Sequence, residues 1–208
     1  MSRSITLVAA LFVVLVAYLL IRNHENNSNL PEQVNHVAQE QAAQEPPKFH
    51  EWREFSFKPD HFKVLLPALP QHVSDKIQDS KTKTRLKYET FASAGDNGAA
   101  FMVNAVSFPA EEPVNEEYLK ALVNDMLARN KENKLLQMKK STFHETPAFD
   151  FSFSNEDLLI EGKIFAHGNT SYILSMINKK NLFDRREWDF FLNSFDFVDD
   201  KQEDSLKK

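Results

Sequence analysis

Residues 149–178, FDFSFSNEDLLIEGKIFAHGNTSYILSMIN, contain the pattern that decides the fold. Phenylalanine occupies every second position from 149 to 153, which is the period of a half-buried strand. Two further strands are predicted at residues 158–167 and 171–178. Their connector at 167–170, His-Gly-Asn-Thr, has the residues of a hairpin turn. This part of the chain therefore predicts consecutive antiparallel hairpins.

The same period of two continues upstream of this stretch. Pro67 ends the first of these segments, and the glycine-containing stretch 95–98 is expected to join two of them. The further strands are predicted at residues 62–66, 73–78, 82–93, 99–108 and 135–142.

Two segments follow a helical period instead. Asn115 is expected to cap a helix over residues 115–130, because acidic residues fill its first turn and apolar residues recur at i, i+3 and i+4. A second helix is expected near 182–193, followed at 194–198 by a short strand or packing clasp. Hairpins with separate helices predict an α+β layer fold with an antiparallel β-sheet.

The N-terminal region has a different character. Residues 5–21 are apolar except for Thr6, and as a helix they span about 25 Å, the short end of what crosses a bilayer. A cleavable signal peptide is the rival interpretation, but no small-x-small cleavage site follows the apolar run. We therefore predict a transmembrane signal anchor at residues 1–22.

The sequence divides the rest of the chain into three parts. Residues 23–47 are rich in Asn, Gln, Glu and Ala and are expected to form a flexible polar linker. A soluble α+β domain is expected at 48–198, followed by a charged tail at 199–208. A slight positive excess before the apolar run favours a single-pass protein of the cell inner membrane with a periplasmic domain.

The order of elements resembles the PsbP-like superfamily over residues 55–198. The resemblance rests on FKVLLP at 62–67, on AFMVNAV at 100–106 with Pro109 behind it, and on FLNSFDF at 191–197. This superfamily includes photosystem II extrinsic proteins, a Ran-binding eukaryotic branch and many bacterial proteins of unknown role. The resemblance implies an α+β fold with an antiparallel β-sheet flanked by helices in α/β/α layers. It implies no shared function or site residues.

Composition and the absence of known motifs exclude several classes of site and activity. The chain has no cysteine, which removes disulfides and thiol nucleophiles, and its net charge of −5 gives no indication of nucleic-acid binding. It contains no P-loop, no dinucleotide fingerprint and no zinc-protease or hydrolase motif, and its histidines lack metal-ligand spacing. We expect no catalytic residue, metal or cofactor. A pair of carboxylates brought together only by folding stays open.

One local pattern suggests a binding surface. Lys81, Lys83, Arg85 and Lys87 alternate with other residues, so a strand would place all four cations on one face. This strip would suit an anionic lipid or an acidic partner protein. A solvated outer face, or lysines that protect an edge strand from pairing, is the competing interpretation.

Three classes of function remain after these exclusions. The first is a non-catalytic, membrane-anchored interaction or accessory subunit, bound to another envelope protein or to anionic lipid. The second is a small-ligand or metal-binding module on the same fold. The third is a hydrolase with a dispersed Asp, Glu and His site. An enzyme should bring titratable groups with perturbed pKa values together, and this criterion separates the classes.

Overall fold

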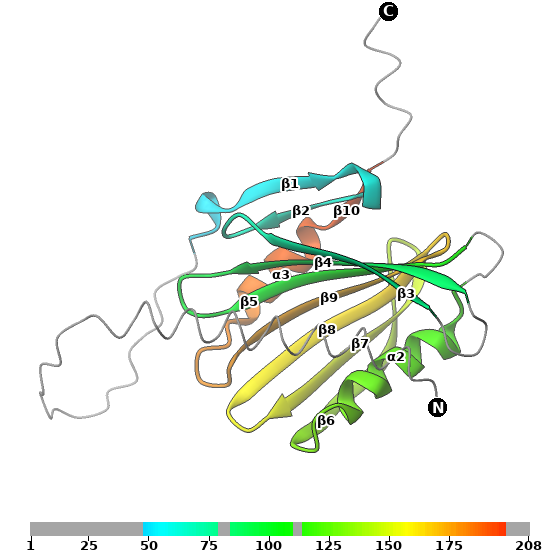
Figure 1. Cartoon of the computed structure of the whole chain (residues 1–208). Coiled ribbons are helices and arrows are strands. Elements are labelled where there is room, and N and C mark those ends of the chain that lie inside the picture. Colours follow the sequence, from blue (N-terminus) through cyan, green and yellow to red (C-terminus); the bar gives the residue numbers. More distant parts are fainter. Residues whose placement is uncertain (1–47, 79–83, 110–113, 199–208) are drawn as a thin grey trace, which may run out of the picture.

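The computed structural model describes residues 48–78, 84–109 and 114–198. These residues form an α+β fold of antiparallel sheets and two α-helices (Figure 1). The predicted anchor at 1–22, linker at 23–47 and tail at 199–208 lie outside the described residues. Among the helices of the described part, none is long and apolar enough to cross a bilayer.

The larger sheet has seven strands in the order β3-β4-β5-β9-β8-β7-β6, and all neighbours are antiparallel. The predicted hairpins are confirmed, and Gly168 in the β8–β9 turn has the positive φ of 60° that this turn requires. The strands are β3 (Gln71–Gln78), β4 (Arg85–Ala94), β5 (Ala100–Ser107), β6 (Asn133–Phe143), β7 (Thr146–Asn155), β8 (Leu158–His167) and β9 (Thr170–Lys179).

A second, three-stranded sheet corrects the expectation of a single sheet. It contains β1 (Arg53–Phe57), β2 (Phe62–Leu66) and β10 (Asp196–Phe197), in the order β1-β2-β10. The 3₁₀ helices η1 (Phe49–Glu51) and η2 (Lys58–Asp60) flank β1. The sequence predicted β2, and at 194–198 it left a short strand or a packing clasp open; the structure has the strand β10 there. Strand β10 pairs with a strand more than a hundred residues away, and no local sequence pattern indicates such a pairing.

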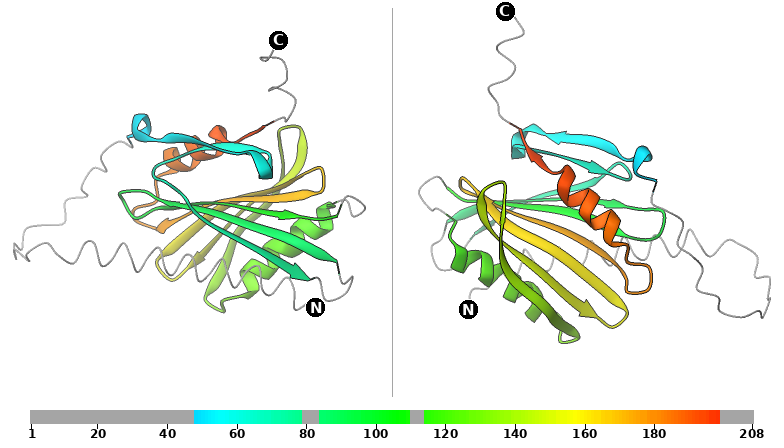
Figure 2. Two further views of the ribbon diagram at one scale, coloured as in Figure 1. Left: turned by 45° about the horizontal axis from the view of Figure 1, so that its top comes forward. Right: turned by 180° about the vertical axis from the view of Figure 1, so that it is seen from behind.

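The two helices lie on opposite faces of the seven-stranded sheet (Figure 2). Helix α2 (Glu116–Ala128) begins as predicted, because the Asn115 side chain accepts a hydrogen bond from the Tyr118 backbone N–H at 2.9 Å. Helix α3 (Arg185–Ser194) begins later than predicted. Its cap is Asp184, whose carboxylate accepts from the Arg186 backbone N–H.

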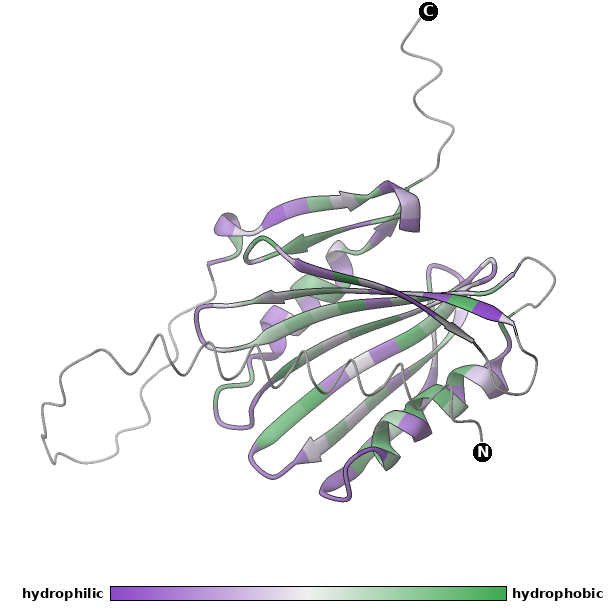
Figure 3. Ribbon diagram, in the orientation of Figure 1, coloured by the Kyte–Doolittle hydropathy of each residue, from purple (hydrophilic) through white to green (hydrophobic). Residues whose placement is uncertain are grey.

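Each face of the seven-stranded sheet carries its own core. Helix α2 buries Leu119, Leu122 and Val123 against an aliphatic and aromatic face that includes the three phenylalanines of β7. On the other face, α3 and the three-stranded sheet enclose an aromatic core, and green hydrophobic segments mark the central strands between these layers (Figure 3). The aromatic core contains Phe62, Phe91, Phe101, Phe165, Tyr172, Trp188, Phe191 and Phe195.

Coverage of both faces explains a second correction. The alternation in β7 predicted a half-buried strand, but Ser152 and Ser154, which project opposite to the phenylalanines, are also buried. Burial of each phenylalanine contributes roughly 1.5–3 kcal/mol to the stability of this doubly covered sheet. The three-stranded sheet and η2 lie above the corner of the larger sheet at β4, where Phe57 packs on Phe91 and Asp60 contacts Lys87.

Candidate functional site: a charge network between the two sheets

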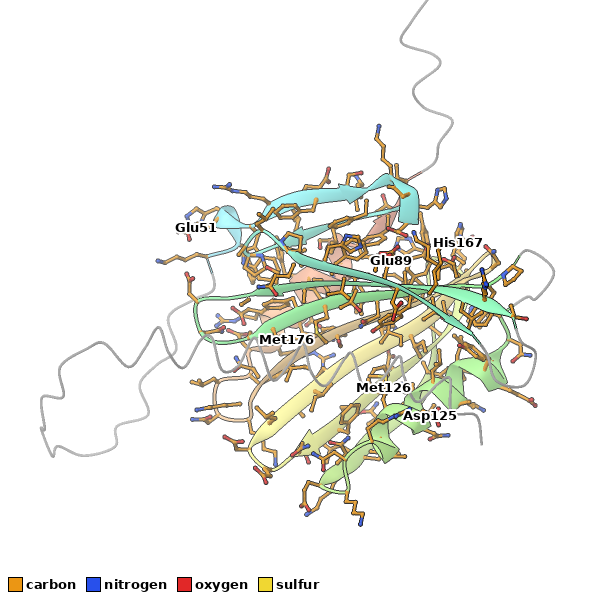
Figure 4. All side chains as sticks on the ribbon, viewed as in Figure 1. Glu51, Glu89, Asp125, Met126, His167 and Met176 are labelled. Carbon is orange, nitrogen blue, oxygen red and sulfur yellow. The ribbon has the colours of Figure 1, made fainter. Side chains whose placement is uncertain are left out.

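Lys87 of β4 is the centre of the main cluster of charged side chains, which lies between the two sheets. Its ammonium Nζ lies 2.7 Å from Asp60 Oδ1 and 2.7 Å from Glu89 Oε1. Lys87 and Glu89 share one face of β4, while Asp60 reaches them from η2 above the sheet. Figure 4 shows Glu89 on the side of β4 that faces the three-stranded sheet. Both carboxylates are almost completely buried, whereas Lys87 is about one-third exposed.

Strand β3 supplies the remaining members of this network. His72 Nε2 contacts Glu89 Oε2, and Ser74 Oγ donates a hydrogen bond of 2.9 Å to Glu89 Oε1. The His72 ring stacks on Phe91 with centroids 4.4 Å apart, which fixes its orientation while half of the side chain stays exposed. On the opposite side, the Tyr172 hydroxyl donates to the Asp60 backbone carbonyl at 3.0 Å. We call Asp60, His72, Ser74, Lys87 and Glu89 the corner network.

The pKa directions in the corner network favour the charged forms. Burial alone would lower the pKa of Lys87, but hydrogen bonds and charge attraction from Asp60 and Glu89 outweigh it and raise that pKa. Burial alone would raise the pKa of Glu89, but hydrogen bonds from Lys87, His72 and Ser74 outweigh it and lower that pKa. A lysine kept protonated is no nucleophile, and a carboxylate of low pKa is a weak base.

The structure describes two of the four residues of the predicted cationic strip. Lys81 and Lys83 lie outside the described residues. Arg85 is exposed at the start of β4, while Lys87 is neutralised by the corner network. Strand β4 pairs with β3 over residues 85–92 and with β5 over residues 87–94, so Lys87 is not on a sheet edge and the edge-protection interpretation does not apply to it.

Other charged groups lie at the hairpins of β6 to β8, where their contacts are structural. Asp150 forms an ion pair with the buried Lys163 of β8. Glu156 occupies a hairpin turn with φ of 47°, and His144 occupies another with φ of 45°. His144 Nε2 also lies 3.1 Å from the Phe195 carbonyl oxygen. Within the described ranges, no group of three His, Asp or Glu side chains is arranged to hold a metal ion.

Two carboxylates that the sequence did not reveal have raised pKa values. Burial raises the pKa of Glu161 on β8, although the nearby Arg185 opposes the shift. Burial also raises the pKa of Glu187 in α3, against a hydrogen bond from Asn97 at 2.9 Å. These are the two carboxyl groups in the described part whose pKa moves in the direction that a general acid needs. No sequence signal marks them, because burial by distant segments causes both shifts.

A buried polar group lies on the α2 side of the sheet. Tyr88 and Thr90 both donate to Asn104 Oδ1, at 2.8 and 2.7 Å, and so direct its Nδ2 away from them. The described residues provide no hydrogen-bond partner for Asn104 Nδ2 or for Ser175 Oγ on the adjacent strand β9. An unsatisfied buried donor costs about 1–3 kcal/mol, so these two atoms are the polar positions here that a small acceptor would satisfy.

Comparison with known proteins supports the fold and no more. The solution structure of cyanobacterial PsbP (CyanoP) from Synechocystis sp. PCC 6803 is similar, with a TM-score of 0.50 and 10% sequence identity over 71% of this chain and 93% of that one. The fold is therefore PsbP-like, as the sequence resemblance implied. A protein of unknown function from Pseudomonas aeruginosa also matches, with a TM-score of 0.35 and 9% identity over 67% of this chain and 90% of its own. No family model and no curated protein matches the chain.

Proposed function

We propose that this protein is a non-catalytic, membrane-anchored interaction or accessory subunit of the cell envelope. In this proposal, residues 5–21 anchor it in the inner membrane and residues 23–47 form the linker to a periplasmic domain. Its partner is another envelope protein or anionic lipid, without a cofactor and without nucleic acid.

The observation that carries the proposal is the state of the corner network. Titratable groups do converge there, as a hydrolase with a dispersed site would require. Their pKa values nevertheless move so that Lys87 stays protonated and Glu89 stays ionised. These directions favour a structural ion network over acid–base or nucleophilic chemistry, and thus a binding role over the hydrolase alternative.

Tethering gives such a binding role a physical basis. A flexible linker of the length of residues 23–47 has a root-mean-square reach of roughly 25–30 Å. A domain held within that distance of the bilayer meets other membrane components at a high effective concentration. An accessory subunit benefits from this confinement, whereas an enzyme of diffusible substrates gains little from it. The PsbP-like fold itself gives no functional preference.

The test measures turnover and association on the same preparation. Full-length protein in detergent is assayed on ester, peptide, glycoside and phosphate substrates, and is also used for affinity capture from solubilised envelope membranes. We expect no turnover and one partner recovered in stoichiometric amount. Turnover that disappears in a folded Glu161→Gln or Glu187→Gln variant would contradict the proposal, because these carboxyls have the raised pKa values that a general acid needs.

A small-ligand module is the second candidate, and one observation favours it. Asn104 Nδ2 and Ser175 Oγ are buried donors without a partner among the described residues, and they lie on adjacent strands. A small molecule with a carbonyl or carboxylate oxygen would satisfy either donor that it reaches. Native mass spectrometry of protein purified from its own membrane would reveal such a molecule, and Asn104→Ala should abolish its retention. Apo protein in both samples would eliminate this candidate.

A further inference from the structure

Strand β6 forms one edge of the seven-stranded sheet along its whole length. Its residues pair with β7 on one side, and no strand of the described residues pairs with it on the other. At eleven residues it is the longest strand in that part of the chain, and most of its side chains are exposed. Such an edge presents a row of backbone N–H and C=O groups to which another strand can bind.

Exposed leucines stand on this edge. Leu135 is 45% and Leu136 58% exposed, and the large hydrophobic residues this exposed in the described part are these two and Leu69. A β-bulge separates Leu135 from Gln137 in the pairing with β7. The regular ladder from Gln137 to Phe143 follows the bulge, so the leucines mark one end of an otherwise uniform edge.

The edge is cationic as well as apolar. Strand β6 contains Lys134, Lys139 and Lys140 and no acidic residue. Lys140 is bound to Glu116 of α2 at 2.7 Å. Lys134 and Lys139 make no ion pair within the described ranges. Both project from the sheet face opposite α2, because their partners on β7, Ser154 and Asp150, lie on that face.

These charges determine which partner the edge accepts. Two copies of β6 paired with each other would bring their lysines together, and like charges across a strand pair are destabilising. The same lysines that repel a second copy of β6 attract the carboxylates of an acidic strand. The other edge, β3, carries Asp75 beside Lys76 and therefore has no uniform sign.

We propose that the β6 edge binds an extended, acidic segment of a partner protein as an additional strand, with apolar side chains of that segment against Leu135 and Leu136. Backbone hydrogen bonds supply the docking in this mode, and alternate side chains supply the selectivity. This inference rests on the proposed interaction function and specifies its surface and the chemistry of its partner.

Hydrogen–deuterium exchange of the full-length protein in detergent tests the surface directly. The probe is a synthetic peptide of alternating glutamate and valine, as long as β6. One control peptide replaces glutamate by lysine, and another carries a central proline that removes a backbone donor. We expect slower exchange in residues 133–143 with the acidic peptide only, and unchanged exchange in residues 71–78.

Matched variants test the charge argument. Lys134→Glu and Lys139→Glu should each weaken binding of the acidic peptide by roughly fivefold, and added salt should weaken binding to the unaltered protein. Lys76→Glu on β3 is the matched control and should leave the affinity unchanged. Protection of β3 instead of β6, equal binding of the lysine peptide, or no protection at all would overturn the proposal.

These results separate this inference from the function on which it rests. Turnover of a substrate would contradict the proposed function, whatever the exchange pattern of β6. Absence of protection in residues 133–143, with a stoichiometric partner still captured, would leave the proposed function standing and remove the β6 surface.

Discussion

At the residue scale, one corner of the domain places a single lysine between two buried carboxylates. Lys87 neutralises two buried carboxylates, Asp60 and Glu89, that otherwise face each other across the junction of the two sheets. Sequence alternation placed Arg85 and Lys87 on one face of a strand, and Glu89 lies on that same face of β4. The alternation gave Lys87 a solvent-facing binding role, because the approach of Asp60 from η2 leaves no trace in the local sequence.

Replacing this lysine should destabilise the protein strongly. Lys87→Met leaves two buried carboxylates without their cation, and we expect a loss of about 3 kcal/mol in the free energy of unfolding. Arg85→Met on the same strand is the control and should change it by less than about 0.5 kcal/mol, because Arg85 is exposed. Urea unfolding in detergent, followed through the fluorescence of buried Trp188, measures both. Equal midpoints for the two variants would show that the corner network carries no stability.

Glu89 makes the free energy of unfolding depend on pH in a defined direction. Its pKa is lowered in the folded state, so its contribution is present above the unfolded pKa of about 4.3 and is lost as the pH falls through the lower folded value. Glu161 and Glu187 have raised pKa values and act in the opposite direction above pH 4.3. The difference in free energy of unfolding between the unaltered protein and the Glu89→Gln variant isolates the contribution of Glu89.

We therefore expect the stability difference between these two proteins to shrink as the pH is lowered from 5 toward 3. Thermal unfolding across that range provides the measurement. A difference that stays constant, or that grows in acid, would mean that Glu89 is not held ionised by its neighbours. Comparison of the two proteins at each pH cancels the contributions of the other carboxyl groups.

At the element scale, the packing of β7 on β8 requires a glycine. Gly162 is paired with Phe151 across the two strands, and a Cβ at that position would lie 2.1 Å from the nearest atom of the Phe151 ring. The ring thus occupies the space that a side chain on β8 would fill. The sequence revealed the phenylalanine period of β7, but the glycine that accommodates it could be identified only once the register was known.

Gly162→Ala should cost about 2–3 kcal/mol in the free energy of unfolding, because the ring cannot move without disturbing the α2 core. In a Phe151→Leu background the same substitution should cost clearly less, since the smaller side chain leaves room for the methyl group. Chemical unfolding of the four proteins of this cycle measures the coupling. Additive effects of the two substitutions would contradict the steric account.

At the scale of the whole molecule, the arrangement in the envelope is a prediction from the sequence. We expect protease added to spheroplasts of a bacterial host to cut within residues 23–47 and release the domain intact, because the linker is polar and the folded sheets resist digestion. Immunodetection of the released domain is the measurement. A domain that survives in spheroplasts and is digested only after lysis would contradict the periplasmic orientation.

The sequence by itself determined the fold class, both α-helices and most of the strands, but not β1 or the 3₁₀ helices. Alternating apolar residues in 149–178, the Asn115 cap and the Pro67 break are local signals, because the side-chain period of a strand or the first turn of a helix involves only near neighbours. The same signals, with the order of elements, were sufficient for the PsbP-like resemblance, which the structural comparison confirms.

The tertiary structure alone decided which residues meet. Two contacts join segments far apart in the chain: β10 pairs with β2, and Asp60 lies beside Lys87. The position of β6 at an edge likewise depends on the order of all seven strands in the sheet. Sequence patterns report how a residue is oriented within its own strand. Distances, burial and pKa shifts depend on what the rest of the chain places against that strand, and this is fixed only when the sheets and helices pack together.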